Sequence, residues 1–272
     1  MSLITVLGGS GFIGSALARR LGESRREYLA PGRDEKLVGR QLGHILYCVG
    51  LTADFRSRPF ETVQAHVCHL LHILRDCDFD SLLYLSSARI YQGAGATTRE
   101  EDPLQVSPSK QDDLYNISKA MGESLALHCG HRVRIVRISN VYGGDFASDN
   151  FLSSLIRDAV NQGRVILRTS PDSERDYIGI DAVVDGLLQI ASGGQHEIYN
   201  LASGVNVSNR ALVERLHTIT GCAIEFLPNA PRLRFPRIRI ERMKAEFDFI
   251  GSDVLADLDQ VVNLYRRHLE TA

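Results

Sequence analysis

The chain has 272 residues, of which 44% are hydrophobic, so it is long enough to bury a large core or a core with a smaller lobe. Its 31 basic and 33 acidic side chains leave a net charge of −2, which favours neither nucleic acid nor a membrane surface as a partner. The five cysteines form no Cys-x-x-Cys pair, which predicts reduced thiols and argues against a zinc site or a redox pair.

The predicted elements alternate between strand and helix. An apolar, β-branched run at 3–9 follows the N-terminus directly, without a basic region and a long apolar segment, so we expect a cytoplasmic protein. Further strands are predicted at 26–32, 44–50, 81–87 and 132–143, and helices at 12–24, 59–77 and 114–130. Strands alternating with amphipathic helices predict an α/β fold with a Rossmann-type, doubly wound parallel sheet.

The regular alternation weakens after residue 143. A polar stretch at 92–113, rich in turn formers, is expected to be a long surface loop beside the site. The stretch 228–244 carries five arginines and indicates irregular and short-strand structure. We therefore expect a smaller C-terminal, substrate-binding lobe. The predicted division is a Rossmann domain over 1–143 with about 177–195, and a lobe over about 144–176 and 196–272.

A glycine-rich turn lies between the first predicted strand and the first helix. Gly8, Gly11 and Gly14 in "GGSGFIG" form the pattern G-x-x-G-x-x-G. The first glycine permits a tight turn, the second lets the backbone approach a pyrophosphate, and the third lets helix and sheet pack closely. With Phe12 and Ile13, they begin a helix whose positive end faces the phosphates. The turn predicts a bound dinucleotide.

The end of the second strand distinguishes the two nicotinamide cofactors. An acid at this place would bind the ribose 2′-hydroxyl of NAD, whereas an arginine would bind the 2′-phosphate of NADP. In "YLAPGRDE", Pro31 or Gly32 stands where the acid is expected, and Arg33 comes next. We therefore expect NADP, with NAD as the alternative because Asp34 follows.

A tyrosine, a lysine and a serine could form a reaction centre. Tyr115 and Lys119 lie four positions apart on a predicted helix, so the ammonium could stabilise the tyrosinate and lower the pKa of the phenol towards neutrality. Ser87 ends a buried strand, at the edge where open α/β sheets bind ligands. A substrate carbonyl could therefore accept hydrogen bonds from Ser87 and Tyr115 while NADPH delivers hydride.

Six pieces occur in the order typical of one family: "GGSGFIG", "LLYLSSARIYQG", "YNISK", "RISNVYGG", "RDYIGIDAVVDGLL" and "EIYNLASG". Over its whole length the chain resembles the extended short-chain dehydrogenases/reductases of the nucleotide-sugar epimerase/dehydratase group. The resemblance implies that Tyr115 is the catalytic acid/base, that Lys119 holds the nicotinamide ribose and that Ser87 polarises the reacting oxygen. It also implies that Gly50 contacts the cofactor, that the substrate is a nucleotide sugar and that the protein is a homodimer.

The residues after the serine narrow the implied reaction. Family dehydratases carry an Asp-Glu pair there, the decarboxylases a glutamate directly after the serine, and the 3,5-epimerase/reductases a cysteine two positions past it. This chain has Ala88 and Arg89 instead. A simple hydride exchange at a sugar carbon remains. We expect an NADP-dependent 4-ketoreductase first, a 4-epimerase with tightly bound NAD second, and a catalytically inactive NADP-binding sensor or scaffold third.

The chain departs from the family pattern at three places. The segment from Arg33 to Ile45 is too short for the usual third strand, which puts the adenine contact in doubt. Gly50 replaces a common alanine after the next strand. His66 in "VQAHV" replaces an asparagine, and we interpret it as a core or supporting histidine.

In the expected lobe, the basic residues stand where the family closes over a pyrophosphate, for which guanidinium groups are suited. Asn140, in "SNVYG", resembles the family residue that contacts the sugar or the diphosphate, although it could equally form a turn. The substrate-binding candidates are Ser87, Asn140, Arg168, Arg175 and Arg237, with Arg175 ranked lowest because its segment could be structural.

Overall fold

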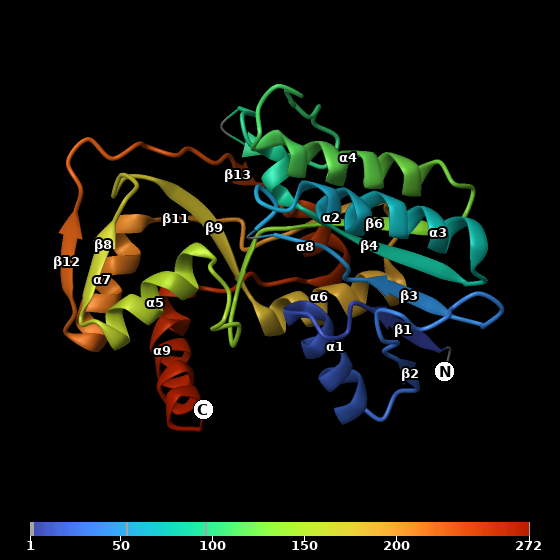
Figure 1. Cartoon of the computed structure of the whole chain (residues 1–272), viewed down its shortest axis with the longest axis horizontal. Helices are drawn as coiled ribbons and strands as arrows, with labels where there is room; N and C mark the ends of the chain where they lie inside the picture. Colours follow the sequence, from blue (N-terminus) through green and yellow to red (C-terminus); the bar gives the residue numbers. More distant parts are fainter. Residues whose placement is uncertain (1–2, 53, 96, 272) are drawn as a thin grey trace.

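The computed structural model describes residues 3–52, 54–95 and 97–271. At its centre is a parallel sheet of six strands in the order β10-β6-β4-β3-β1-β2 (Figure 1). Its strands are β1 (Ile4–Leu7), β2 (Tyr28–Leu29), β3 (His44–Tyr47), β4 (Ser81–Ser87), β6 (Val133–Ile138) and β10 (Ile198–Leu201). The predicted Rossmann-type parallel sheet is confirmed. β2 forms one edge and no strand lies beyond it among the described residues, as the short segment after Arg33 predicts.

Helices cover both faces of this sheet (Figure 1). One face carries α1 (Phe12–Glu23) and α6 (Ile180–Gly193); the other carries α4 (Asp113–Leu127) and a continuous helical segment of α2 (Pro59–Val63), the π-turn η1 (Gln64–Cys68) and α3 (His69–Asp76). Successive side chains of β3 point to opposite faces of the sheet. Leu46 packs in the hydrophobic cluster on the α1 and α6 face, whereas Ile45 and Tyr47 pack in the cluster on the α3 face. Burial on both sides explains why the sheet strands read as continuous apolar runs.

The smaller part of the molecule has a core of its own. The helices α5 (Phe151–Asn161), α7 (Asn209–Thr220) and α9 (Val254–Thr271) pack around the parallel pair β8 (Arg164–Leu167) and β12 (Ala223–Phe226). A three-stranded sheet of β11 (Asn206–Ser208), β9 (Glu174–Gly179) and β7 (Asn140–Tyr142) joins the two parts. The remaining elements are η2 (Ala88–Tyr91), β5 (Thr97–Thr98), β13 (Arg237–Ile238) and α8 (Glu241–Phe247).

Two boundaries differ from the sequence prediction. The strand predicted over 132–143 is two strands, because the chain leaves the main sheet after Ile138 and β7 pairs with β9 instead. The lobe predicted over 196–272 includes β10, yet β10 pairs with β6 in the main sheet and its apolar residues pack in the core on the α1 and α6 face. A single apolar strand carries no information on which sheet it will join.

The predicted loop at 92–113 has no long helix or strand: it contains β5, which pairs with β13, and α4 begins at its last residue, Asp113. Ala96 in this loop lies outside the described residues, as do residues 1, 2, 53 and 272. No helix in the described part of the chain is long and apolar enough to cross a membrane.

Candidate active site

The glycine turn needs its first and third glycines for close packing. Gly8 has a φ of +82°, and a Cβ there would lie 3.0 Å from the carbonyl carbon of Cys48, the residue after β3. A Cβ on Gly14 would lie only 2.2 Å from the carbonyl oxygen of Gly8. Gly11 is the N-cap of α1 and supplies no capping side chain, and Phe12 and Ile13 form the first turn. The turn therefore presents a helix N-terminus at the carboxyl edge of the sheet, which suits a pyrophosphate.

Arg33 and Asp34 both lie exposed in the turn that follows β2. The neighbouring acid, Glu35, accepts a hydrogen bond from the Gly32 N–H at 3.1 Å and pairs with Arg40, so its carboxylate is already engaged. The described residues provide no hydrogen bond or ion pair for the Arg33 side chain. The geometry therefore leaves both Arg33 and Asp34 able to meet a ribose.

Ser87 and Tyr115 come together from different elements. Ser87 ends β4 and Tyr115 lies in the first turns of α4, where it is 3% exposed. Burial raises the pKa of the Tyr115 phenol, while a hydrogen bond with Ser87 and the positive charge of Arg89 oppose this rise. A buried phenol beside a hydroxyl and a cation can hold and protonate a substrate oxygen.

Lys119 lies one turn along α4 and is 4% exposed. Its ammonium donates a hydrogen bond to the Leu85 carbonyl oxygen at 2.7 Å. Burial lowers its pKa to about 7, against the opposing charge of Glu123. Gly50 is close by, since a Cβ added there would lie 3.4 Å from the Lys119 Nζ. The structure thus brings Gly50 and Lys119 together. The predicted fall of the Tyr115 pKa towards neutrality is not found, because burial raises this pKa, and the cation that opposes the rise is Arg89 rather than Lys119.

Arg89 is the site residue that sequence reasoning did not assign. Its guanidinium lies 5.8 Å from the centre of the Tyr115 ring and 5.0 Å from that of Phe55. Its Nε is buried with no hydrogen-bond partner in the described chain. Burial lowers its pKa, and the charge of Arg56 acts in the same direction. The only sequence signal was its place two residues after Ser87.

A buried ion pair supports this centre from behind. Arg137 on β6 contacts Glu123 on α4 at 2.7 Å, and both side chains are 5% exposed. Ser86 donates its hydroxyl to the same carboxylate, and Arg137 donates to the Tyr91 hydroxyl at 2.7 Å. Glu123 therefore joins α4 to the end of β4 through Ser86. Its negative charge also raises the pKa of Lys119 and so opposes the effect of burial.

Of the predicted substrate-binding residues, two form hydrogen bonds to backbone carbonyl oxygens and a third lies exposed on the surface. Asn140 donates its amide to the Asp176 carbonyl oxygen at 2.8 Å, which ties β7 to β9. Arg237 donates through Nε to the Gly204 carbonyl oxygen at 2.7 Å. Arg168 lies exposed just after β8.

Arg175, ranked lowest from sequence, has the most suggestive surroundings. Its guanidinium lies 4.6 Å from the centre of the Phe151 ring and 5.2 Å from that of Phe235. Its Nε is buried without a partner among the described residues, and its charge acts on Arg89. Arg89 and Arg175 thus each lie over aromatic rings and each have an Nε without a hydrogen-bond partner, which suits an anionic ligand.

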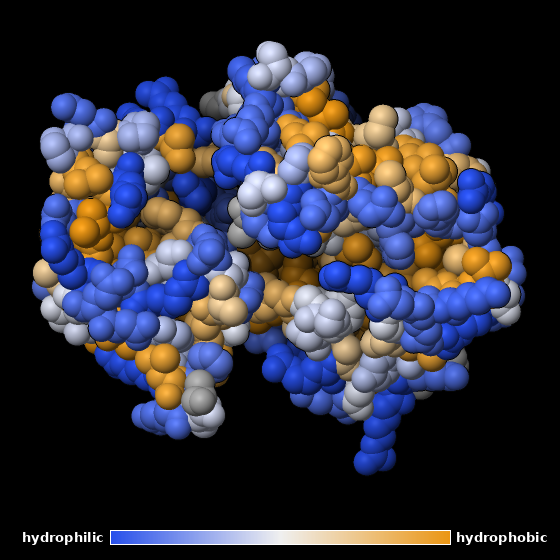
Figure 2. Space-filling view, in the orientation of Figure 1, coloured by the Kyte–Doolittle hydropathy of each residue, from blue (hydrophilic) through white to orange (hydrophobic). Residues whose placement is uncertain are grey.

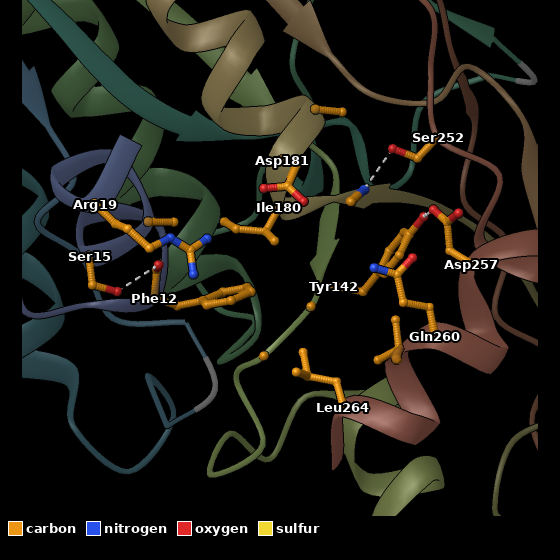
Figure 3. A pocket seen from close by; sticks show the side chains of 16 residues that line it. Phe12, Ser15, Arg19, Tyr142, Ile180, Asp181, Ser252, Asp257, Gln260 and Leu264 are labelled. Atoms are coloured by element: carbon orange, nitrogen blue, oxygen red, sulfur yellow. Dashed lines mark hydrogen bonds between the residues drawn. The ribbon is translucent and has the colours of Figure 1, made fainter. Parts of the chain in front are cut away.

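A cavity of about 630 Å³ lies between α1, the start of α6 and α9 (Figure 3). Phe12 lines it on the Rossmann side, and Tyr142, whose hydroxyl donates to Asp257, lines it on the other. Ser87, Tyr115 and Lys119 do not line it. The surface between the two parts of the molecule is hollowed (Figure 2). The described residues contain no group of three or more His, Cys, Asp or Glu that could hold a metal ion.

Known proteins of the same fold bind nicotinamide cofactors. The chain is 24% identical to a dTDP-4-dehydro-6-deoxy-D-allose reductase from Streptomyces, over 97% of this chain and 96% of that protein. Its structure matches RMD from Pseudomonas aeruginosa complexed with NADPH, with a TM-score of 0.82, 22% identity, and 98% and 100% of the two chains covered. It also matches MoeE5 in complex with UDP-glucose and NAD, with a TM-score of 0.82, 20% identity, and 98% and 99% covered.

The model of one protein family matches residues 4–202, which include the glycine turn, Ser87, Tyr115 and Lys119. Its members are NAD(P)-dependent enzymes of the extended short-chain dehydrogenase/reductase type. The chain therefore belongs to the NAD dependent epimerase/dehydratase family.

Proposed function

We propose that the protein reduces a nucleotide-linked 4-keto sugar, commonly a deoxy sugar, with NADPH, and that Tyr115 is the general acid. The observation that carries this proposal is the hydrogen bond between Ser87 and Tyr115, one helical turn from Lys119, at the same carboxyl edge of the sheet as a glycine turn suited to a dinucleotide. The reductase from Streptomyces, which aligns over nearly the whole chain, supports it.

The residues present fit a nicotinamide cofactor. The packed glycines leave the N-terminus of α1 free of a capping side chain, so its N–H groups can meet a pyrophosphate. Gly50 and Lys119 would lie along the nicotinamide half, and Arg33 would bind a 2′-phosphate. When bound, the cofactor would supply hydride. We propose NADP because the exposed Arg33 is free to bind that phosphate.

The chain supplies the proton and the fixed dipoles. Ser87 and Tyr115 would hold the carbonyl oxygen by two hydrogen bonds, and the phenolic proton of Tyr115 would pass to that oxygen as the carbon is reduced. The raised pKa of Tyr115 keeps the phenol protonated at neutral pH, which suits an acid in the reducing direction. Arg89 would then stabilise the tyrosinate that remains.

For the nucleotide, we propose that Arg175 binds the diphosphate. Its guanidinium is stacked and its Nε is unused, whereas Arg237 and Asn140 already have backbone partners. Arg168 remains a weaker candidate.

The test is NADPH oxidation with a panel of nucleotide-linked 4-keto sugars. We expect one NADP⁺ per sugar reduced, and Tyr115→Phe should retain NADPH binding but lose turnover by at least about a hundredfold. If Tyr115→Phe leaves every detectable activity unchanged, the catalytic assignment fails.

The same assay distinguishes the alternative. A nucleotide-sugar 4-epimerase, for which Asp34 could help to hold NAD, would convert its sugar with no net change in cofactor. A protein that binds NADPH and converts no sugar would be a sensor or scaffold, a role for which neither Ser87 nor a buried Tyr115 is required.

We also propose a homodimer, a cytoplasmic location and a two-part division. Phe60 on α2 and Met121 on α4 are 86% and 57% exposed on helices that contact one another, which suits a subunit interface. All five cysteines are free, which suits a reducing compartment. The division follows the predicted boundaries, with β10 moved into the Rossmann part.

A further inference from the structure

Two departures from the family pattern, His66 and Gly50, are neighbours in space. His66 lies in the π-turn η1 and its side chain is fully buried. Gly50 follows β3, on the loop that we propose to contact the cofactor. A Cβ added to Gly50 would lie 3.2 Å from the His66 Nε2, closer than side chains usually pack. A methyl group at residue 50 would therefore require the imidazole to shift by a few tenths of an ångström.

The two ring nitrogens of His66 bond to two different elements. Nε2 accepts a hydrogen bond from the Leu51 N–H at 3.3 Å, on the loop that carries Gly50. Nδ1 lies 2.8 Å from the Ser118 hydroxyl on α4. The ring also meets the Tyr115 ring edge-on, with 5.2 Å between the ring centres. His66 thus touches the cofactor loop and the tyrosine at once.

The direction of these hydrogen bonds follows from the donors. A backbone N–H can only donate, so Nε2 must accept and the neutral ring must carry its proton on Nδ1. Burial lowers the pKa of His66 to about 2, and the charge of Lys119 acts in the same direction, so the ring stays neutral. Nδ1 then donates to Ser118, which donates to the Tyr115 carbonyl oxygen at 2.9 Å. Every donor has one acceptor.

The backbone around His66 is anchored as well. In the π-turn the carbonyl oxygen of Ala65 accepts a hydrogen bond from Tyr47 at 2.6 Å, and that of His66 accepts one from Tyr84 at 3.2 Å. Both tyrosines are fully buried, on β3 and β4 respectively. The imidazole therefore starts from a fixed position relative to the sheet. Such turns occur often at functional sites.

We propose that His66 is a positioning residue that fixes the Gly50–Leu51 loop relative to Tyr115, and that the missing side chain at Gly50 lets the imidazole keep this position. This inference rests on the proposed function, because it assumes that the loop contacts the nicotinamide cofactor and that Tyr115 reacts. His66 would act through its hydrogen bonds to Leu51 and Ser118 and through its packing against the Tyr115 ring. It sets how far the cofactor loop stands from the catalytic helix.

Two substitutions of His66 test its hydrogen bonds to Leu51 and Ser118 separately. Asparagine places its amide near the Nδ1 position, so His66→Asn can keep the bond to Ser118 but loses Leu51. Glutamine reaches the Nε2 position, so His66→Gln can keep Leu51 but loses Ser118. We expect His66→Asn to raise the Kd for NADPH about tenfold with kcat within about twofold, since one lost hydrogen bond costs about a factor of ten. His66→Gln and Ser118→Ala should instead lower kcat about tenfold with the Kd kept.

Gly50 gives an independent test through a double-mutant cycle. With His66 present, Gly50→Ala should raise the NADPH Kd about tenfold, because the methyl group displaces the ring. In the His66→Asn background, the same substitution should change the Kd by less than about twofold, because the Nε2 that it would meet is gone. The contact with Lys119 is present in both backgrounds, so the difference reports the imidazole alone.

His69→Gln is the matched control. His69 lies on the same helical segment and contacts Tyr47 at 3.0 Å, but it bonds to neither Leu51 nor Ser118. Its substitution should leave both Kd and kcat within about twofold. The proposal is overturned if His66→Asn and His66→Gln change Kd and kcat alike, or if Gly50→Ala costs the same in both backgrounds.

These outcomes are distinct from failure of the proposed function. NADPH binding is measured by fluorescence without any sugar, so the Kd for His66→Asn and the cycle at Gly50 remain decisive even if no 4-keto sugar is reduced. A wild-type protein that binds neither NADPH nor NADH would overturn both proposals.

Discussion

Lys119 should make the stability of the folded protein depend on pH. Burial lowers the pKa of its ammonium from 10.5 to about 7. Between these values the unfolded chain holds a proton that the folded chain releases, so the wild type should become more stable as pH rises from 7 to 10.5. At 1.36 kcal/mol per pKa unit, the buried charge costs about 5 kcal/mol below pH 7. Lys119→Met removes this cost, together with the bond to Leu85.

The wild type and Lys119→Met should be unfolded in urea at pH 6, 8 and 10, in buffer without nucleotide. Circular dichroism would monitor the unfolding. The free energy of unfolding of Lys119→Met minus that of the wild type should fall by about 4 kcal/mol from pH 6 to pH 10, because pH 10 is still below 10.5. Lys110→Met is the control, since Lys110 is exposed, and its difference from the wild type should stay flat. Parallel stability curves for the wild type and Lys119→Met would refute the reasoning.

Three further predictions follow from the same site. Arg33→Ala should weaken NADPH binding about tenfold or more and NADH binding hardly at all, as measured by fluorescence titration; equal losses would remove the argument for a 2′-phosphate. Arg89→Met removes the cation that lowers the pKa of Tyr115, so oxidation of the sugar alcohol by NADP⁺, which needs the tyrosinate, should require higher pH; an unchanged pH profile of kcat/KM would contradict this. Glu123→Gln breaks the ion pair with Arg137, whose two side chains are each 5% exposed, and should lower the free energy of unfolding by about 3–5 kcal/mol. The double variant Glu123→Met with Arg137→Met should lose much less. Additive losses in urea unfolding would exclude an energetic coupling between the two residues.

The fold was predictable because most strands of the main sheet are short apolar runs, and the helices between them have apolar residues at helical spacing. The glycine turn, the alternation up to Ser87 and the helix that carries Tyr115 all follow from local patterns. The break after Ile138 did not, because the residues on both sides of it favour strand equally. The tertiary pairing separates the two strands, since β6 pairs with β4 in the main sheet and β7 pairs with β9 in the three-stranded sheet.

For the candidate site too, some features could be predicted from the sequence and others could not. From the sequence, Ser87, Tyr115 and Lys119 could be predicted as the reacting residues, because a serine at the end of a strand, a Tyr-x-x-x-Lys helix and an upstream glycine turn occur together in one chain. The tertiary structure decided what surrounds them: Arg89 beside the phenol, Glu123 facing Lys119, and His66 filling the space left by Gly50. Sequence patterns record periodicity along one element, whereas charges and buried side chains act across space between elements. The electrostatic setting of Tyr115 therefore depends on contacts between residues far apart in the chain.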